Sequence, residues 1–444
     1  MITELKSAPI DANSATLERL AALSRERRVW LRVGRLIDGM NNRPISDASI
    51  VFDASQIYDV TSAGRRPAAD QLSLGQRDYD ALLPEFTLLP CLVEAHAHLF
   101  LQGAPVDLAV RNQHLKLPAK ELIEQARARW PKLMKFGIGA IRDAGDKDGV
   151  GLALAAEAKQ QRGQTAIAPW IDSPGAALYH RGRYGKFMGE PIEDYDGATA
   201  CVADRVRTGA DRIKLLVSGI IDFRVGEVTS APQMPTSEVA AIVKAATELG
   251  RQTFAHASGA AGVEHSIAGG VTTVEHGYFI TQGQVARMRD AQIAWVPTFA
   301  PVQAQIDHAD ELGWEPNVVQ TLQRIIDGHR QMLCAAHAMG ATVLAGSDAG
   351  SCGVPHGIGL LDELCHMEQA GMPAMAVLKS ATGASAETLA FAESVGRIAP
   401  GCRARFILTR HDPSASVANL RRDKVIMFDG TATACEGAVD ATGL

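Results

Sequence analysis

The sequence predicts an α/β protein built on a (β/α)8 TIM barrel, with a small β-sandwich domain beside it. Eight strand-like segments alternate with helical segments over roughly 300 residues, which favours a barrel over an open doubly wound sheet. No glycine-rich phosphate loop follows these strands, which argues against a dinucleotide-binding sheet. Of the 444 residues, 46% are hydrophobic and 21% charged, so a large core is expected.

The first part of the chain is predicted to be a helix followed by short strands. Residues 1–28 form an N-terminal helical extension in which Leu17, Leu20 and Leu23 share one face. Segments 29–36 and 48–60 alternate in polarity like antiparallel strands. Residues 61–83 are rich in Ala, Gly, Arg, Asp and Gln, and we expect them to be irregular.

Residues 86–390 are predicted to form the barrel. Its helices include 118–135, 151–161, 236–249 and 317–339. Its eight strands are predicted at 86–93, 137–142, 167–172, 212–217, 252–256, 271–276, 293–297 and 342–347.

The helical pattern stops beyond residue 387, and short strands are predicted at 405–409 and 424–428. The dipeptide Asp429-Gly430 is typical of a turn. Because β-rich segments flank the barrel at both ends, residues 29–85 and 391–444 are predicted to meet as one composite β-sandwich domain.

Composition limits the partners. The net charge is -6 without a long basic run, which argues against nucleic acid and membrane partners and favours a small-molecule substrate. Seven cysteines without a CxxC motif argue against a disulfide framework and a thiolate zinc site. Residues 1–28 contain acidic side chains and no apolar segment, so no signal peptide is expected and the predicted location is cytoplasmic.

Two histidines end the first predicted barrel strand. Side chains alternate along a strand, so His96 and His98 point the same way, about 6.6–7 Å apart along the backbone. Parallel imidazoles can converge on one metal ion, although His-x-His alone is also typical of a polar strand end.

Further polar residues follow the later strands. In a barrel, catalytic groups lie at the carboxyl ends of the strands. There the sequence has Lys214 on strand 4, His256 on strand 5, His276 on strand 6 and Asp348 after strand 8. Together with His96 and His98, they predict one polar site at one end of the barrel.

Around these residues the chain resembles the amidohydrolase superfamily, and in detail it is most similar to the prolidase and imidazolonepropionase-like branch. The resemblance extends from residue 29 to the C-terminus. It rests on Glu-Ala-His-Ala-His at 94–98, Ile-Lys-Leu-Leu-Val-Ser-Gly at 213–219, Ala-His-Ala at 255–257, Val-Glu-His-Gly at 274–277 and Gly-Ser-Asp-Ala-Gly at 346–350.

The resemblance implies a centre of two divalent metal ions, for which zinc is the expected metal, with manganese or iron as alternatives. His96 and His98 would bind the first ion, and His256 and His276 the second. Lys214 would be carbamylated to N6-carboxylysine, and its two oxygens would bridge the ions. Homo-oligomerisation is also implied.

Asp348 is implied to bind the first metal and to act as general base and then acid. A metal-activated bridging hydroxide would attack the substrate carbonyl. The predicted reaction is hydrolysis of a C–N amide bond in an N-acyl amino acid, dipeptide, aryl amide or carbamate.

Other functions remain alternatives. A lactone or phosphotriester hydrolase would use a similar metal set. A mononuclear deaminase is less favoured, because Gly259 stands where deaminases have a glutamate and Lys214 would have no role. A non-catalytic member would be expected to lack ligands, and all are present.

Substrate contacts are predicted from loops. His180 and Tyr184 lie in the loop after strand 3, and His356 lies after strand 8. Glu94 stands where the family has aspartate, which we expect to alter the support of the ligands and not the ligand set.

Overall fold

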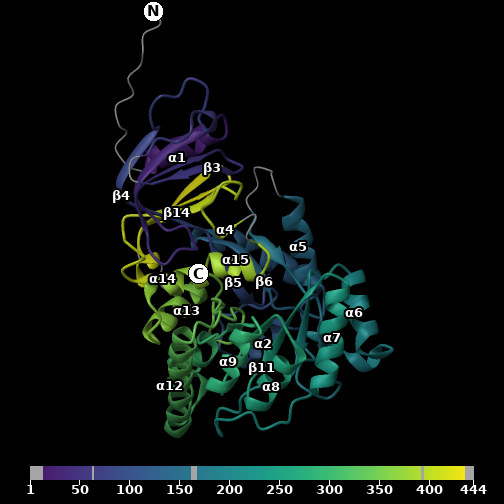
Figure 1. The fold of residues 1–444 in the computed structure, drawn as a ribbon. Coiled ribbons are helices and arrows are strands. Elements are labelled where there is room, and N and C mark those ends of the chain that lie inside the picture. Colours follow the sequence, from purple (N-terminus) through teal and green to yellow (C-terminus); the bar gives the residue numbers. More distant parts are fainter. Residues whose placement is uncertain (1–13, 63–64, 162–167, 392–394, 436–444) are drawn as a thin grey trace, which may run out of the picture.

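The fold was analysed in a computed structural model that describes residues 14–62, 65–161, 168–391 and 395–435. Residues 1–13 of the predicted helical extension and residue 167 of a predicted strand lie outside the described residues. So do residues 63–64, 392–394 and 436–444 of the predicted composite domain. One mixed sheet lies beside two parallel sheets that helices surround (Figure 1). The chain is therefore an α/β protein, as predicted.

The mixed sheet joins the two ends of the chain. Strand β4 pairs in parallel with β1 and antiparallel with β14, so head and tail share one hydrogen-bonded sheet. Its seven strands are, in spatial order, β16 (Thr431–Cys435), β15 (Lys424–Phe428), β14 (Arg405–Thr409), β4 (Ala81–Pro90), β1 (Val29–Leu36), β2 (Ile45–Phe52) and β3 (Ile57–Thr61).

Helix α1 (Ser14–Ser24) covers part of this sheet (Figure 1). Leu17 and Leu20 are no more than 1% exposed and join the apolar cluster formed by the sheet. The apolar face predicted for this helix therefore packs on the strands. Burial of such side chains stabilises the packed helix by about 1.5–3 kcal/mol each.

The chain changes sheets at Cys91. The sequence predicts one strand over 86–93, but the structure has two: β4 ends at Pro90, and β5 (Leu92–Ala97) begins two residues later. The reason is a switch of hydrogen-bond partner. Cys91 N–H donates to Arg405 in the mixed sheet at 3.0 Å, whereas Leu92 N–H donates to Gly137 beside the parallel strands at 2.8 Å.

The remaining strands are parallel and nearly all buried, as sheets covered on both faces require. One group is β5, β6 (Ile138–Asp143) and β7 (Trp170–Asp172). The other, in spatial order, is β13 (Ala294–Val296), β12 (Thr273–His276), β11 (Gln252–Ala257), β10 (Arg212–Leu216), β8 (Ala177–Tyr179) and β9 (Gly189–Pro191). Strands β8 and β9 were not predicted.

The predicted strand at 342–347 is replaced by isolated bridges, at Trp295–Val343 and Ala97–Ala349. The ladder is interrupted because Ala345 N–H donates to the carbonyl of Ser380 at 3.1 Å instead of to a neighbouring strand. The segment still lies between the two parallel groups. Asp348 N–H donates to His96 at 2.8 Å, and Leu344 N–H donates to Trp295 at 2.9 Å.

Helices follow most of the parallel strands. Within the described residues, no helix combines the length and the hydropathy that crossing a membrane requires. The helices after β5 are α2 (Leu108–His114), α3 (Ala119–Ala128), α4 (Trp130–Lys135), α5 (Val150–Gln160), α6 (Gly197–Arg207), α7 (Thr236–Glu248), α8 (Ala260–Gly269), α9 (Gln282–Asp290), α10 (Ala300–Asp307), α11 (Ala309–Leu312), α12 (Pro316–Ala338), α13 (Ile358–Gln369), α14 (Ala374–Ser380) and α15 (Gly383–Thr388).

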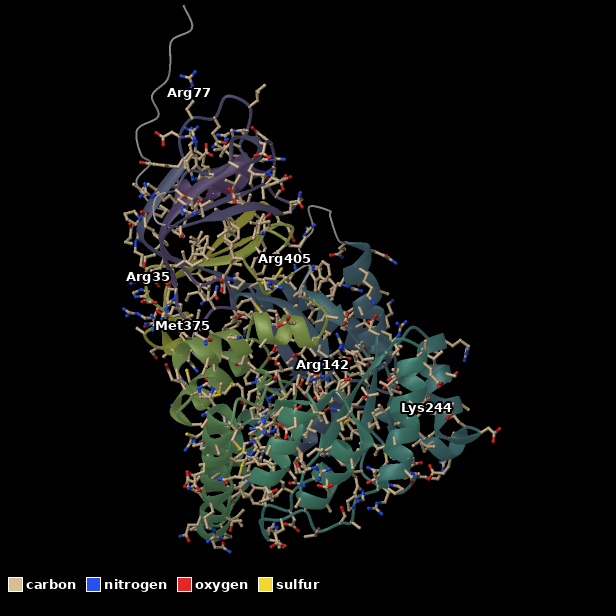
Figure 2. The ribbon with its side chains drawn as sticks, in the orientation of Figure 1. Arg35, Arg77, Arg142, Lys244, Met375 and Arg405 are labelled. Atoms are coloured by element: carbon tan, nitrogen blue, oxygen red, sulfur yellow. The ribbon has the colours of Figure 1, made fainter. Side chains whose placement is uncertain are left out.

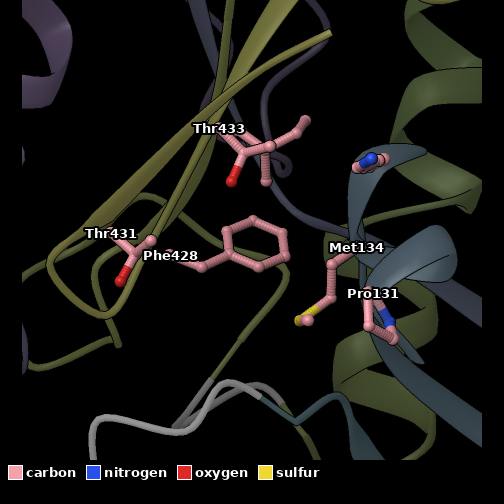
Figure 3. A pocket seen from close by; sticks show the side chains of 7 residues that line it. Pro131, Met134, Phe428, Thr431 and Thr433 are labelled. Atoms are coloured by element: carbon pink, nitrogen blue, oxygen red, sulfur yellow. The ribbon is translucent and has the colours of Figure 1, made fainter. Parts of the chain in front are cut away.

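Arg405 links the mixed sheet to the parallel strands (Figure 2). Its guanidinium pairs with Asp429 and donates to the carbonyl of Gly139 in β6 at 3.1 Å. A small cavity of about 110 Å³ lies nearby, between Pro131 and Met134 of α4 and Phe428 of β15 (Figure 3). Among the described residues, its lining contains Lys135 but no carboxylate, histidine or cysteine, so it lacks the usual metal ligands.

Candidate metal centre

Five of the six predicted metal ligands line one cavity of about 470 Å³. They are His98, Lys214, His256, His276 and Asp348. The sixth, His96, lies directly behind them, with its ring centroid 5.7 Å from that of His98 and 5.1 Å from that of His276. The strands therefore bring together all the residues that the sequence places at their ends.

His96, His98 and Asp348 converge on one point. Their ligand atoms all lie within 4.8 Å of one another. Asp348 Oδ1 is 3.5 Å from His96 Nε2 and 3.6 Å from His98 Nε2, too far for good hydrogen bonds. Within the described residues, His96 Nε2 and Asp348 Oδ1 have no hydrogen-bond partner. Buried polar atoms are normally paired, so this group fits a cation held between them.

His256 and His276 form a second pair, with ring centroids 4.6 Å apart. His276 Nδ1 is 2.8 Å from the hydroxyl of Thr298, which leaves Nε2 available as a ligand atom. In His256 the roles of the two ring nitrogens are reversed. Its Nε2 is 3.2 Å from the carbonyl of Gly219, which leaves Nδ1 available.

The orientation of the first pair is set in the same way. His98 Nδ1 is 3.1 Å from the carbonyl of Gly145, and His96 Nδ1 is 2.5 Å from Glu275 Oε2. These acceptors favour the tautomer with a proton on Nδ1 and a lone pair on Nε2. Arg142 (Figure 2) contacts the same Glu275 oxygen at 2.7 Å and so holds the carboxylate.

Burial makes the four histidines suitable ligands. It lowers the pKa of His98 to about 3 and that of His256 to about 4, and it lowers the pKa of His96 and His276 well below the usual value. Neutral imidazoles can donate a lone pair to a metal. Burial also raises the pKa of Asp348 to about 7, because a buried carboxylate without a cation is unfavourable.

Lys214 projects from β10 among these histidines and is only 1% exposed. Burial lowers its pKa to about 8, and its Nζ lies 4.7 Å from the centroid of the Phe254 ring. Within the described residues, no ion pair with Lys214 is formed. A buried lysine with a depressed pKa is a reactive amine, which fits its conversion to a carbamate.

Glu94 joins the first strand to the segment that precedes Asp348. Its two oxygens accept hydrogen bonds from the backbone N–H of Ser347 at 2.9 Å and from the Ser347 hydroxyl at 2.7 Å. Burial raises the pKa of Glu94 to about 7. Its contacts are thus with the backbone and the side chain of Ser347, which precedes Asp348, consistent with the expected supporting role.

The three predicted substrate contacts have different positions. Tyr184 lines the cavity, with its ring centroid 5.2 Å from that of His256. His180 is not among the lining residues and instead contacts Glu193 at 2.7 Å and Glu238 at 2.8 Å. His356 is also absent from the lining; its Nε2 lies 3.0 Å from the carbonyl of His98. Direct substrate contact is therefore supported for Tyr184 alone.

Sequence reasoning missed Arg111, Glu275 and Arg142. Arg111 lines the cavity from α2, a helix that the sequence analysis did not predict. Glu275 and Arg142 are charged residues inside otherwise apolar strands, and each is no more than 1% exposed. A charge in a predicted buried strand was the available signal, because such groups are rarely buried unless paired.

The amidohydrolase family model matches residues 87–431, more than three quarters of the chain. The chain belongs to the amidohydrolase family. This confirms the superfamily inferred from the strand-end motifs, and it supports hydrolase chemistry at the cavity. This amidohydrolase is 28% identical over 295 residues to an uncharacterized protein of Mycobacterium tuberculosis, which covers 66% of this chain and 72% of that one.

Two further relatives cover most of this amidohydrolase. It is 23% identical over 449 residues to an ochratoxinase of Aspergillus niger, covering 94% of this chain and 88% of the relative. A crystal structure of a Xaa-Pro dipeptidase with bound methionine matches with a TM-score of 0.74 and 26% identity, covering 92% of this chain and all of that one. The mixed α/β architecture with parallel strands is thus shared with family members, and prolidase-like proteins are among them.

Proposed function

We propose that this amidohydrolase is a binuclear metal-dependent enzyme that cleaves a C–N amide bond in a small-molecule substrate. The observation that supports this most is the convergence of His96 Nε2 and Asp348 Oδ1, two buried atoms 3.5 Å apart without hydrogen-bond partners in the described structure. A cation between them would pair both atoms at once.

The other cavity residues support a second ion. His96, His98 and Asp348 would hold the first ion, and His256 and His276 the second. Imidazole and carboxylate donors suit zinc, with manganese or iron as alternatives. Bound at these residues, two divalent ions supply an activated water near neutral pH and polarise the scissile carbonyl.

Lys214 would link the two groups as N6-carboxylysine. An ammonium has no lone pair, whereas a carbamate has two anionic oxygens that can face two cations. The depressed pKa and the lack of an ion pair for Lys214 among the described residues both support this modification.

Asp348 would move the proton of the reaction. The hydroxyl of Ser351 donates to Asp348 Oδ2 at 2.8 Å and holds the carboxylate, and Oδ1 faces His96 and His98. Asp348 would take a proton from the attacking water while the oxygen of that water bonds to the carbonyl carbon. The C–N bond would then break as Asp348 delivers the proton to the leaving nitrogen.

Tyr184 would donate a hydrogen bond to the substrate. Burial raises the pKa of its hydroxyl above the usual value, so it stays a neutral donor. His356 would act as a positioning residue through the backbone of His98. His180 would order the loop that contains Tyr184 through its contacts with Glu193 and Glu238.

The finer architecture belongs to the same proposal. We propose that the parallel strands form a closed (β/α)8 barrel over residues 86–390, with 29–85 and 391–444 as a β-sandwich domain. Hydrogen bonds from Asp211 to Ser173 at 2.8 Å and from Asp348 to His96 at 2.8 Å support closure at two edges. A cytoplasmic location and a homo-oligomeric assembly remain predictions from the sequence.

The test combines metal analysis with a substrate screen. Purified protein should contain two divalent ions per chain and hydrolyse at least one member of a panel of N-acyl amino acids, dipeptides, aryl amides and carbamates. Chelation should abolish that activity, and a divalent metal should restore it. Activity that resists chelation would contradict the binuclear proposal, and a panel without any substrate would contradict amide hydrolysis.

A further inference from the structure

Arg111 is a cavity cation that the proposed reaction does not use. It lies on α2 and lines the cavity that contains Asp348. Its guanidinium donates to the carbonyls of Pro105 at 3.2 Å and Gly350 at 3.1 Å. Within the described residues, no carboxylate pairs with it. Of the five N–H donors of a guanidinium, these two bonds leave several available.

The charges around the cavity favour an anion at this position. Arg111 is a cation of the lining that the proposed metal centre does not use, since Lys214 is assigned to the carbamate and Asp348, the single carboxylate among the described lining residues, to the first metal ion. Burial lowers the pKa of Arg111, because its charge is partly removed from water and Asp348, which favours that charge, forms no direct ion pair as a counter-ion. A substrate carboxylate would provide that counter-ion through the two-pronged contact that arginine favours.

Much of the rest of the wall is apolar, although Ser258, Gln305 and Ser351 also line it. The apolar part includes Leu101, Leu108, Phe187, Ile220, Phe223 and Val302. Leu108 is 67% exposed and Ile220 is 56% exposed, so apolar side chains face solvent along the cavity. Leu108 and Arg111 are three residues apart on α2 and therefore share one face. One face of α2 thus contributes both an apolar side chain, Leu108, and a cation, Arg111, to the cavity wall.

We propose that Arg111 binds the carboxylate of the substrate, and that the substrates are N-acyl amino acids with a bulky apolar group. This rests on the proposed amide hydrolysis and narrows it. A neutral aryl amide would leave Arg111 without a carboxylate partner. A dipeptide would place its free ammonium in a cavity whose one described carboxylate is already used.

The test compares substrates that differ in these groups, the dipeptide also having two more carbons between its acyl ring and the scissile carbonyl. N-benzoyl-L-phenylalanine has the carboxylate, N-(2-phenylethyl)benzamide has the same scissile bond without it, and L-phenylalanyl-L-phenylalanine adds an ammonium. The wild type should prefer the first by about 100-fold or more in kcat/KM, since an unpaired buried charge is costly. Equal rates for the first and either other substrate would overturn the proposal.

Variants separate binding from chemistry. Arg111→Gln should raise KM for N-benzoyl-L-phenylalanine about 30-fold or more with a small change in kcat, and Arg111→Lys should have an intermediate effect. Neither should change KM for the decarboxylated amide. The control is Arg224→Gln, which removes a nearby cation that lies over Trp314 and is not among the lining residues. Equal losses on both amides would contradict carboxylate binding.

A binding measurement keeps this inference distinct from the proposed reaction. Calorimetric titration of N-benzoyl-L-phenylalanine into full-length protein with Asp348→Asn does not require turnover. Binding that Arg111→Gln removes and Arg224→Gln retains would support the carboxylate site even if no substrate in the panel is hydrolysed. Binding that Arg111→Gln leaves unchanged, or no binding at all, would overturn it.

Discussion

Glu275 Oε2 lies 2.5 Å from His96 Nδ1, so a carboxylate on β12 determines which nitrogen of a residue on β5 faces His98 and Asp348 in the candidate metal centre. The same oxygen contacts Arg142 at 2.7 Å, and both partners are essentially inaccessible to solvent. Neither contact can be read from the local sequence, because the residues are separated by more than 130 positions. The orientation of His96 in the candidate metal site therefore depends on a buried ion pair behind it.

Glu275→Gln is expected to weaken metal binding and folding together. Loss of the carboxylate should reduce metal affinity about 10- to 100-fold, because the His96 ring loses its orienting partner. It should also lower the free energy of unfolding by about 3–5 kcal/mol, since Arg142 is left buried and unpaired. Metal titration and urea unfolding measure the two effects.

The matched control is Glu264→Gln, which breaks an ion pair with Arg287 in which both side chains are at least 41% exposed. Exposed pairs contribute little, so its effect on stability should stay below about 1 kcal/mol. Equal effects of the two substitutions would contradict the role assigned to Glu275.

Lys214→Ala should abolish activity and lower the metal content. The alanine removes the group that would link the two ions, and short carboxylic acids should restore part of the activity by supplying oxygens in its place. Elemental analysis and rates with and without added acetate provide the measurement. Lys244→Ala is the control, because this lysine lies on the outer helix α7 and is 78% exposed (Figure 2). Full metal content in Lys214→Ala would exclude a bridging role.

Asp348→Asn should affect turnover more than metal binding. The asparagine amide can still bind a metal ion through its oxygen, but it cannot act as a general base. We therefore expect kcat to fall by about 10²- to 10⁴-fold. Both ions should remain, as elemental analysis would show. Ser351→Ala removes only the hydrogen bond to Asp348 Oδ2 and should have a smaller effect. A fully active Asp348→Asn enzyme would remove this residue from the proton transfer.

His180 should make stability depend on pH. Burial lowers its pKa, but hydrogen bonds to Glu238 and Glu193 outweigh burial and raise the pKa above 6.5. The folded state therefore binds the proton more tightly than the unfolded chain. The resulting stabilisation is fully present below about pH 6.5 and is lost as pH rises through the folded pKa.

The size of this effect is at most about 1 kcal/mol, because His180 and both glutamates are partly exposed. Urea unfolding at pH 5.5 and 8.5 should show a larger loss of stability with pH in the wild type than in His180→Gln. An identical pH dependence in both proteins would show that the contacts with Glu193 and Glu238 do not stabilise the fold.

Much of the candidate site could be predicted because side chains alternate between the two faces of a strand with a period of two residues. His96 and His98 are two residues apart, so a strand must point them the same way, and their side chains do meet at one end of β5. The parallel strands β10, β11 and β12 then bring Lys214, His256 and His276 to the same end.

Other features could not be predicted because they depend on partners far along the chain. The strand expected over 86–93 is divided at Cys91, where the hydrogen-bond partner changes from Arg405 to Gly137. The strand expected at 342–347 is interrupted because Ala345 bonds to Ser380. Local polarity gives no sign of either partner.

The sequence by itself determined the family, the order of the strand-end residues and their chemical types, because these follow from motifs and from alternation along each strand. Tertiary structure alone decided the rest: Glu275 behind His96, His180 outside the cavity, His356 on the backbone of His98, and Arg111 in the wall. The physical reason is that loops and buried charges follow no repeating pattern in the local sequence. Their positions depend on long-range hydrogen bonds and packing.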